Sequence, residues 1–260
     1  MKGGERLKSS ITGLLTRMVP WAIPFFLLIL WQTLSMQGVI PDRILPAPTD
    51  VFATGFTLLM SGELIDHISI SLWRAIVGFL IGGSIGFLLG LFNGIFRISD
   101  LLFDTSIQML RNIPHLAMIP LVILWFGIDE VSKVFLVALG VLFPIYINTY
   151  HGIKSVDKTL IEMGKAYGLK GPSLFFTIIF PGALSSILVG IRFSLGVMWL
   201  TLIVAETISA HTGIGYMAMI AREFMQMDVI VLSIVLYALF GKLSDVIARY
   251  FEGKWLQWNT

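Results

Sequence analysis

The sequence predicts an all-α polytopic membrane protein with six transmembrane helices and with both termini in the cytoplasm. Three observations predict this fold class: the composition, the length of the apolar stretches and the distribution of basic residues. Of the 260 residues, 56% are hydrophobic and only 13% are charged, and the mean hydropathy is +0.87. A soluble domain carries about 25% charged residues, so lipid rather than water must surround most of this chain.

Six apolar stretches are long enough, or nearly so, to cross a bilayer as a helix, which takes about 20 residues. The first follows a basic segment like that of a signal peptide, but no small-residue cleavage site follows it, so we expect an uncleaved span. The third and fifth contain Arg111 and Arg192 and are the least regular. The stretches are residues 18–36, 70–95, 105–127, 132–150, 182–206 and 228–248.

Lysine and arginine set the orientation, because the cytoplasmic segments of membrane proteins carry an excess of them. With a cytoplasmic N-terminus, the outer segments hold only three of these residues, Arg43, Lys133 and Arg222. The inner segments hold 12, namely Lys2, Arg6, Lys8, Arg17, Arg97, Lys154, Lys158, Lys165, Lys170, Lys242, Arg249 and Lys254. The reverse orientation would invert this bias, so both termini and residues 151–181 are predicted to be cytoplasmic.

Two outer segments are predicted to contain short helices. After the first span, three prolines favour extended backbone, and an amphipathic helix is expected over residues 50–60 with Thr49 as its cap. Residues 209–228 contain Gly213 and Gly215 and are expected to form a broken or re-entrant helix.

A glycine recurs at every fourth position of the second span, at Gly78, Gly82, Gly86, Gly90 and Gly94. Overlapping GxxxG units of this kind let another helix approach closely in lipid, so we expect a packing face. The same stretch contains a literal G-x-S-x-G. A hydrolase nucleophile elbow also needs a strand-to-helix turn and partner Asp and His residues, and the sequence supports none of these.

Ionisable and polar residues within the spans are candidates for a translocation pathway, because such groups are costly in lipid and usually face a wet cavity. Arg111, Asn112 and His115 lie in the third span, and Arg192 and Glu206 lie in the fifth. Their cations would attract an anionic solute. Alternatively, His115 is a hydrogen-bonded packing residue and Glu206 caps the outer end of its span.

The two arginines also have structural alternatives, which are that Arg111 pairs with Asp104 and that Arg192 extends to the cytoplasmic interface. Pro114 and Pro120 each remove a backbone hydrogen bond, so the third span should be kinked or partly unwound. Irregular backbone at membrane depth must be covered by protein or line a cavity. The kinks therefore favour a pathway, although packing alone would also explain them.

A polar, glycine-punctuated segment, EMGKAYGLKGPSLFFTIIFPG, covers residues 162–182 between the fourth and fifth spans. In it, Glu162 is followed at fixed spacing by Gly168, Ile178, Phe180 and Pro181. This pattern resembles the EAA signature of ABC-importer permeases, E-A-A-x3-G-x9-I-x-L-P. The register is kept at every anchor position.

The segment departs from the signature at three positions. Met163 and Gly164 replace the two alanines, and Phe180 replaces the leucine. Gly164 weakens a helix by about 1 kcal/mol relative to alanine. A short helix is still predicted over residues 157–167, ending at Gly168. The Gly171-Pro172 pair would then reverse the chain, and Pro181 would start the next span.

The resemblance covers about residues 20 to 258. Over these residues the chain is similar to the sulfonate, taurine and nitrate branch of these permeases. The stretches ILPAPTDVF, SGELIDHISISLWRAIVGF, DTSIQMLRNIPHLAMIPLVILWFGIDEVSKVFLVALG and FPIYINTYHGIKSVD carry it. The likeness is closest to the permeases of aliphatic sulfonate importers. Taurine, nitrate or bicarbonate are the alternative substrates.

The resemblance implies a type I ABC-importer permease fold in the bacterial cytoplasmic membrane. The implied partners are a second copy of the chain, two ABC ATPase subunits, an external solute-binding protein and the lipid bilayer. ATP and Mg would be bound by the partner ATPase. This chain has no G-x-x-x-x-G-K-[ST] phosphate loop, so we expect no cofactor on it and no enzyme activity.

The resemblance also assigns roles to residues and segments. The residues that would couple to the ATPase are Glu162, Lys165, Ala166, Tyr167, Gly168 and Pro181. Along the chain we expect a cytoplasmic tail (1–17), the first span with the external amphipathic segment (18–66), the transmembrane core (67–250) with its cytoplasmic coupling loop (151–181), and a second cytoplasmic tail (251–260).

Other function classes are disfavoured by the residues. The chain has no cysteine, which excludes disulfides and thiolate chemistry. An intramembrane enzyme would need an acid–base or metal constellation, yet the four histidines are scattered and no H-E-x-x-H occurs. A passive channel would not need a docking segment. The net charge is only +2 and no basic run with interleaved aromatics occurs, so no nucleic-acid partner is expected.

Overall fold

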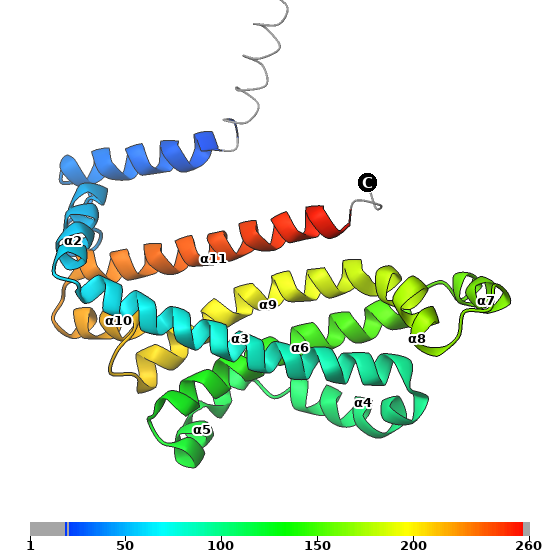
Figure 1. Cartoon of the computed structure of the whole chain (residues 1–260). Coiled ribbons are helices and arrows are strands. Elements are labelled where there is room, and N and C mark those ends of the chain that lie inside the picture. The colour runs from blue at the N-terminus through cyan, green and yellow to red at the C-terminus, as the bar shows by residue number, and fades with distance from the viewer. Residues whose placement is uncertain (1–18, 20, 257–260) are drawn as a thin grey trace, which may run out of the picture.

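The computed structural model describes residue 19 and residues 21–256, and every regular element within them is a helix (Figure 1). An N-terminal apolar helix covers Trp21–Met36. The elements that follow are α2 (Pro48–Met60), α3 (Glu63–Ile95), α4 (Arg97–Arg111), a 3-10 turn (His115–Met118), α5 (Ile119–Phe126), α6 (Glu130–Lys154), α7 (Lys158–Ala166), α8 (Gly171–Leu174), a π-helical turn (Phe175–Ile179), α9 (Phe180–Ser209), α10 (Ile214–Glu223) and α11 (Met227–Trp255).

Four of the described helices are long and apolar enough to span a membrane: α3, α6, α11 and a continuous helical run from Gly171 to Ser209 that includes α9. A fifth span is added if the bent pair α4 and α5 crosses together. The N-terminal helix is apolar but shorter than a full span. Its predicted span starts at residue 18, and residues 1–18 and 20 lie outside the described part of the chain.

The prediction that the third span is broken is confirmed. The axes of α4 and of the helical segment Leu116–Phe126 differ by 78°, and the break between them contains Pro114, which cannot donate a backbone hydrogen bond. Pro120 does not add a second kink. It lies in the first turn of α5, where a helix tolerates proline because its missing N–H has no partner to lose.

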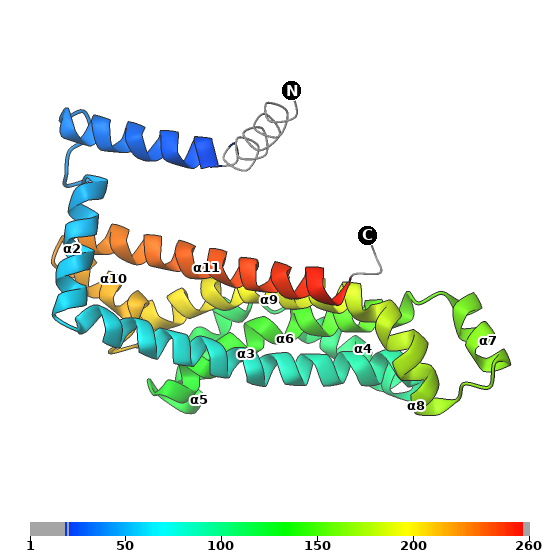
Figure 2. The same cartoon turned by 45° about the horizontal axis from the view of Figure 1, so that its top comes forward.

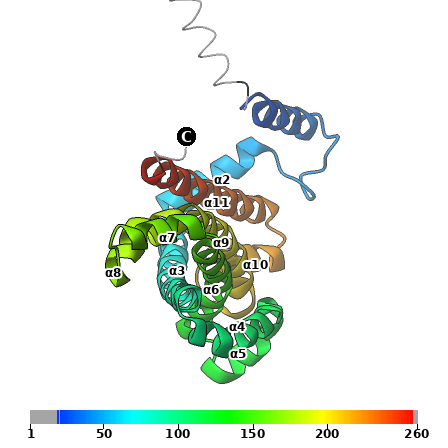
Figure 3. The same cartoon turned by 90° about the vertical axis from the view of Figure 1, so that its right-hand side faces the viewer.

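The core of the bundle is built by α3, α6 and α9, which pack along one another in that order (Figures 2 and 3). The glycine face of α3 lies directly on the backbone of α6. A Cβ atom at Gly82 or Gly86 would overlap the carbonyl oxygen of Ala138 or of Leu142. The absence of side chains therefore decides how closely these two helices approach.

The N-terminal helix lies apart from the bundle and is joined to it through α2 (Figures 1 and 3). The Gln32 side chain bridges the two, since its Oε1 accepts from the Thr49 N–H at 3.2 Å and its Nε2 donates to Thr49 Oγ1 at 3.1 Å. The helix predicted over residues 50–60 is present, but the prediction that Thr49 caps it is wrong. Thr49 lies inside α2, and Gln32 from another helix satisfies its N–H instead.

Replacing Gly86 by leucine should disrupt the α3–α6 contact. The added side chain would meet main-chain atoms, which cannot move without separating the helices, at a cost of about 3 kcal/mol or more. We expect a several-fold lower yield of monodisperse protein by size-exclusion chromatography and a lower melting temperature. The matched control is Gly253→Leu, because a Cβ there has no neighbour within 4 Å. Equal yields of the two variants would contradict the packing role.

Candidate functional site

The predicted coupling segment forms a compact helix at the end of the bundle where α6 and α9 are joined (Figures 1 and 2). The Asp157 side chain caps α7 by accepting from the Thr159 N–H at 2.8 Å. Gly168 follows the helix with φ +87°, a conformation that favours glycine and reverses the chain. Local sequence signals thus define both ends of α7.

Gly164, which stands where the signature has alanine, is the buried contact of α7. A Cβ atom there would lie 3.0 Å from Leu174 Cδ1 and would overlap Ile178 Cδ1. The glycine therefore lets α7 pack against the helical run that leads into α9. This packing compensates for the low helix propensity of glycine.

The opposite side of α7 is open to a partner. Glu162, Lys165, Ala166 and Gly168 are exposed, and Tyr167 is 83% exposed. A carboxylate, an ammonium group and an aromatic ring are thereby presented together on a short helix that stands away from the bundle (Figure 2). Such a surface offers charge-assisted hydrogen bonds and a large apolar anchor to a docking protein.

Pro181 is the second residue of α9, but helical backbone begins earlier, at Gly171. The intervening π-helical turn, Phe175–Ile179, ends two residues before the proline. A turn of this kind accommodates a residue that cannot donate to the regular helical ladder. The loop is therefore connected to α9 by continuous helix rather than by a flexible hinge.

Two pathway candidates of the third span, Arg111 and Asn112, lie on the outside of the chain. Arg111 is the last residue of α4, and both it and Asn112 are exposed. His115 begins the 3-10 turn. The alternative that Arg111 pairs with Asp104 is wrong, since Asp104 accepts from Tyr146 Oη at 2.9 Å and from Gln108 at 3.3 Å, and no ion pair of Arg111 is found within residues 21–256.

Arg192 pairs across the groove between α9 and α11. Its Nε donates to Asp245 Oδ1 at 2.6 Å, and its Nη1 lies 3.7 Å from Glu252 Oε2. The arginine side chain retains 35% exposure and the aspartate side chain 26%. The pair is thus accessible from one side of the chain.

Glu206 is fully buried and is the centre of a polar network, so it does not simply cap the outer end of its span. Its carboxylate accepts from Arg74 at 2.8 Å, from Ser71 at 2.7 Å and from the hydroxyl of Tyr237 at 2.9 Å. It also accepts from the backbone N–H of Gly215 at 2.9 Å. The network joins α3, α9, α10 and α11.

Arg74 extends this network to α6 and to the segment before α10. Its side chain is 0% exposed and forms a bidentate pair with Glu130 at 2.6 and 2.7 Å. It also donates to the Thr212 carbonyl at 2.6 Å. Gly213, with φ +112°, lies so close that a Cβ atom would come within 2.6 Å of the guanidinium. Sequence reasoning gave Arg74 no role, although an arginine within an apolar run was the signal used for Arg111.

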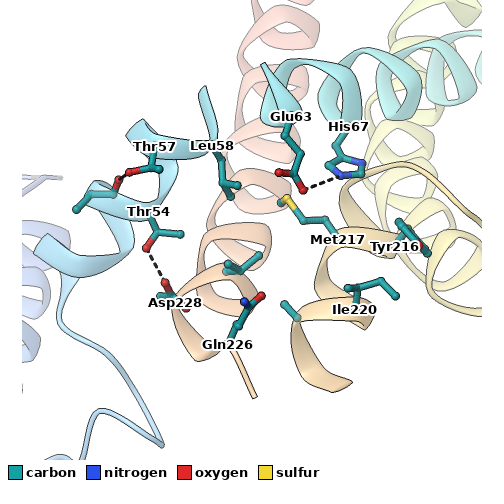
Figure 4. Close-up of a pocket in the computed structure, with 13 residues that line it drawn as sticks. Thr54, Thr57, Leu58, Glu63, His67, Tyr216, Met217, Ile220, Gln226 and Asp228 are labelled. Carbon is teal, nitrogen blue, oxygen red and sulfur yellow. Dashed lines mark hydrogen bonds and ion pairs between the residues drawn. The ribbon is translucent and has the colours of Figure 1, made fainter. Parts of the chain in front are cut away.

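A cavity of about 470 Å³ opens at the opposite end of the bundle from α7 (Figures 1 and 4). Segments from α2, α3, α10 and α11 line it, with the carboxylates of Glu63 and Asp228 and the imidazole of His67 among its polar groups. Asp228 is held by Thr54 Oγ1 at 2.6 Å, and Glu63 faces His67 at 3.8 Å (Figure 4). Among the described residues, no lysine or arginine lines this cavity, so its charge does not suit an anionic solute.

Comparison with known proteins gives a consistent result. Residues 82–257 match the family described as "Binding-protein-dependent transport system inner membrane component". The chain is 61% identical to a protein of Escherichia coli (strain K12) named for aliphatic sulfonates transport, the permease protein SsuC, over 94% of this chain and 93% of that one. The corresponding Bacillus subtilis (strain 168) protein is 44% identical, over 92% of this chain and 86% of that one. The E. coli (strain K12) taurine transport system permease protein TauC is 32% identical, over 90% of this chain and 86% of that one.

Solved structures share the fold at low sequence identity. A chain of the MetNI methionine ABC transporter in an inward-facing conformation is 18% identical with a TM-score of 0.54, covering 75% of this chain and 97% of that one. A chain of an amino acid ABC transporter is 19% identical with a TM-score of 0.58, covering 76% and 96%. The helix arrangement is thus that of ABC-importer permeases.

The Arg74 network makes a prediction about stability. Arg74→Gln removes the only arginine that contacts Glu206 among the described residues and leaves its buried carboxylate without a cation, which should cost about 3–5 kcal/mol. We expect a marked fall in the melting temperature of the purified chain, followed by tryptophan fluorescence. The double variant Arg74→Gln/Glu206→Gln should recover part of the loss, and Arg222→Gln, at an exposed arginine, should melt like the wild type. Equal melting of all four proteins would contradict the role of the network.

Proposed function

Because the chain belongs to the family of binding-protein-dependent transport system inner membrane components, we propose that it is the permease subunit of an ABC importer for aliphatic sulfonates. The substrate assignment rests on the 61% identity, over nearly the whole chain, to a permease named for aliphatic sulfonates transport. Identity to the taurine permease is about half as high, at 32%. The chain is a multi-pass inner-membrane protein, and transport rather than catalysis is its activity.

The proposed topology has six spans with both termini in the cytoplasm. It counts the bent pair α4–α5 as one span and the N-terminal helix, with part of the segment before it, as another. The apolar side chains of that helix are largely exposed, Ile23 by 71% and Phe26 by 63%, which suits contact with lipid or a second subunit. The C-terminal end of α11 and α7 lie at the same end of the bundle (Figure 1), in keeping with the excess of basic residues in both segments.

The proposed domain limits remain those expected from the sequence. They are a cytoplasmic tail (1–17), the first span with α2 (18–66), the transmembrane core (67–250) with its coupling loop (151–181), and a C-terminal tail (251–260). The continuous helix from Gly171 to Ser209 supports treating the loop as part of the core, because it leaves no flexible boundary between them.

We further propose that α7 is the coupling helix and that its exposed face docks on an ABC ATPase. Glu162 would accept a charge-assisted hydrogen bond from a basic group of that subunit, and Tyr167 would fill a pocket on it. In the full importer two copies of this chain would each bind one ATPase, which holds ATP and Mg. An external binding protein would deliver the solute at the end opposite α7.

Transport would then follow from the stiffness of the helices. Movement of α7 is transmitted through its Gly164 contact to the helical run that begins at Gly171 and continues as α9. Since α9 carries Arg192 and Glu206, a displacement at the coupling end reaches both the ion pair and the buried network. Closure of two ATPases would in this way open one side of the dimer axis and close the other.

The coupling role of Glu162 is tested by Glu162→Ala. Loss of one charge-assisted contact, about 1.5–3 kcal/mol, should reduce sulfonate uptake about tenfold or more. The yield and melting temperature should stay unchanged, because Glu162 is exposed. Glu223→Ala, which removes an exposed carboxylate near the opposite end, is the control. Wild-type uptake by Glu162→Ala would contradict this assignment.

The substrate is tested by uptake of labelled ethanesulfonate into cells with and without the chain, in competition with unlabelled taurine, nitrate and sulfate. We expect uptake to be lost on deletion and nitrate and sulfate not to compete. Unchanged uptake on deletion would contradict the sulfonate assignment and leave taurine, nitrate or bicarbonate as substrates of the same architecture. An intramembrane enzyme would instead show turnover without any partner ATPase.

A further inference from the structure

A groove of about 480 Å³ runs between α9 and α11 and is open on one side. Its walls are mainly apolar, and Arg192 and Asp245 are the charged residues that line it within the described part of the chain. Gly196 and Gly241, one from each helix, leave space in it, since a Cβ at either would meet nothing within 4 Å. The lining residues are Val189, Arg192, Phe193, Leu195, Gly196, Val197, Leu200, Gly241 and Asp245.

Three cations converge on the single carboxylate at one side of this groove. Asp245 lies 2.6 Å from Arg192, 3.1 Å from Arg249 and 3.6 Å from Lys242. Glu252 adds a second carboxylate, 3.7 Å from Arg192. Three positive and two negative charges leave an excess of one positive charge. Lys242 and Arg249 are about 60% exposed, so this excess is accessible.

The position of the groove makes these charges costly. Arg192 lies within the predicted span 182–206, and Gly241 lies within the predicted span 228–248. The groove therefore begins within the membrane and its charged side faces the cytoplasmic end, where Lys242 and Arg249 are expected. Ionisable groups at that depth are expensive and normally serve a solute or ion. Helix packing alone would be served more cheaply by apolar residues.

We propose that this groove binds an alkanesulfonate during translocation, with the sulfonate on Arg192 and the aliphatic chain along Phe193 and Leu200. The proposal rests on the proposed function and assigns the residues that would select its substrate class. A sulfonate presents three acceptor oxygens in a geometry that suits a guanidinium. It would replace Asp245 as the partner of Arg192, and Arg249 and Lys242 would keep Asp245 neutralised.

The apolar walls explain a preference for an aliphatic chain. Val189, Phe193 and Leu200 follow one another at helical spacing on the same face of α9. Each methylene group buried against them should strengthen binding about fourfold until the groove is filled. The cavity beside α2 and α10 has carboxylates in place of cations, so it does not offer an equivalent site.

The test is saturation-transfer NMR of hexanesulfonate with the full importer complex in phosphatidylcholine nanodiscs, without the binding protein. We expect Arg192→Gln to weaken affinity about tenfold or more, by loss of a charge-assisted contact. Asp245→Asn should strengthen it, because the competing carboxylate is gone. Lys254→Gln, at an exposed cation on the same helix that does not line the groove, should bind like the wild type.

A second variant keeps the test decisive if Arg192→Gln fails to fold. Gly196→Leu places a side chain in open space, so it should fold normally while filling the groove and abolishing hexanesulfonate binding. Gly253→Leu is its matched control, since a Cβ there also meets nothing and lies outside the groove. Equal binding by wild type and Gly196→Leu, or no binding by wild type, would overturn the proposal.

An anionic lipid, like an alkanesulfonate, joins an anionic group to an aliphatic chain. Changing the lipid composition of the nanodiscs distinguishes these two ligands. If phosphatidylglycerol in the nanodiscs abolishes hexanesulfonate binding by the wild type, the groove is a lipid site and the sulfonate assignment is overturned. Sulfonate uptake by cells distinguishes a failure of the groove proposal from a failure of the proposed function. Normal uptake by Gly196→Leu would refute the groove alone, whereas no uptake by the wild type would refute the proposed function.

Discussion

One buried guanidinium holds the bundle together at the end opposite the coupling helix. Arg74 is fully buried and paired with Glu206 and Glu130, so it ties α3 to α9 and to α6. Its contact with Thr212 also fixes the segment that leads into α10. Breaking a buried ion pair exposes an uncompensated charge to a low-dielectric interior, which is far more costly than losing an apolar contact. The helices at this end must therefore move together or exchange these partners.

The coupling end is organised differently, by local sequence signals. The Asp157 cap and the positive φ of Gly168 define α7, and Gly164 sets it against the start of the next helix. From Gly171 to Ser209 the backbone is helical without interruption. At about 1.5 Å per residue, this run connects the docking surface to the Arg74 network over most of the length of the bundle. A stiff connection of this kind suits a protein whose energy source is a separate subunit.

Between the two ends, the charges within the spans have two distinct environments. Arg74 and Glu206 are sealed within the bundle and satisfied, so they serve architecture, while their neighbour Glu130 keeps 43% exposure. Arg192 and Asp245 lie in an open groove and carry excess positive charge around them, so they are available to a solute. The same residue type at membrane depth thus serves packing in one place and recognition in the other. Burial and the number of partners distinguish them, and hydropathy does not.

The sequence alone predicted the fold class, the short helix that ends at Gly168 and the glycine face of α3, because composition, spacing and turn residues act locally or with a fixed helical period. It also predicted the break at Pro114. It did not reveal the Arg74 network, and it misassigned Thr49 as a cap, since the partner Gln32 is 17 residues away. Arg192 was recognised as unusual, but its partner Asp245 lies 53 residues further along the chain. Which charges are sealed and which are open was decided only by the tertiary packing of α3, α6, α9 and α11, because no local rule determines contacts between distant helices.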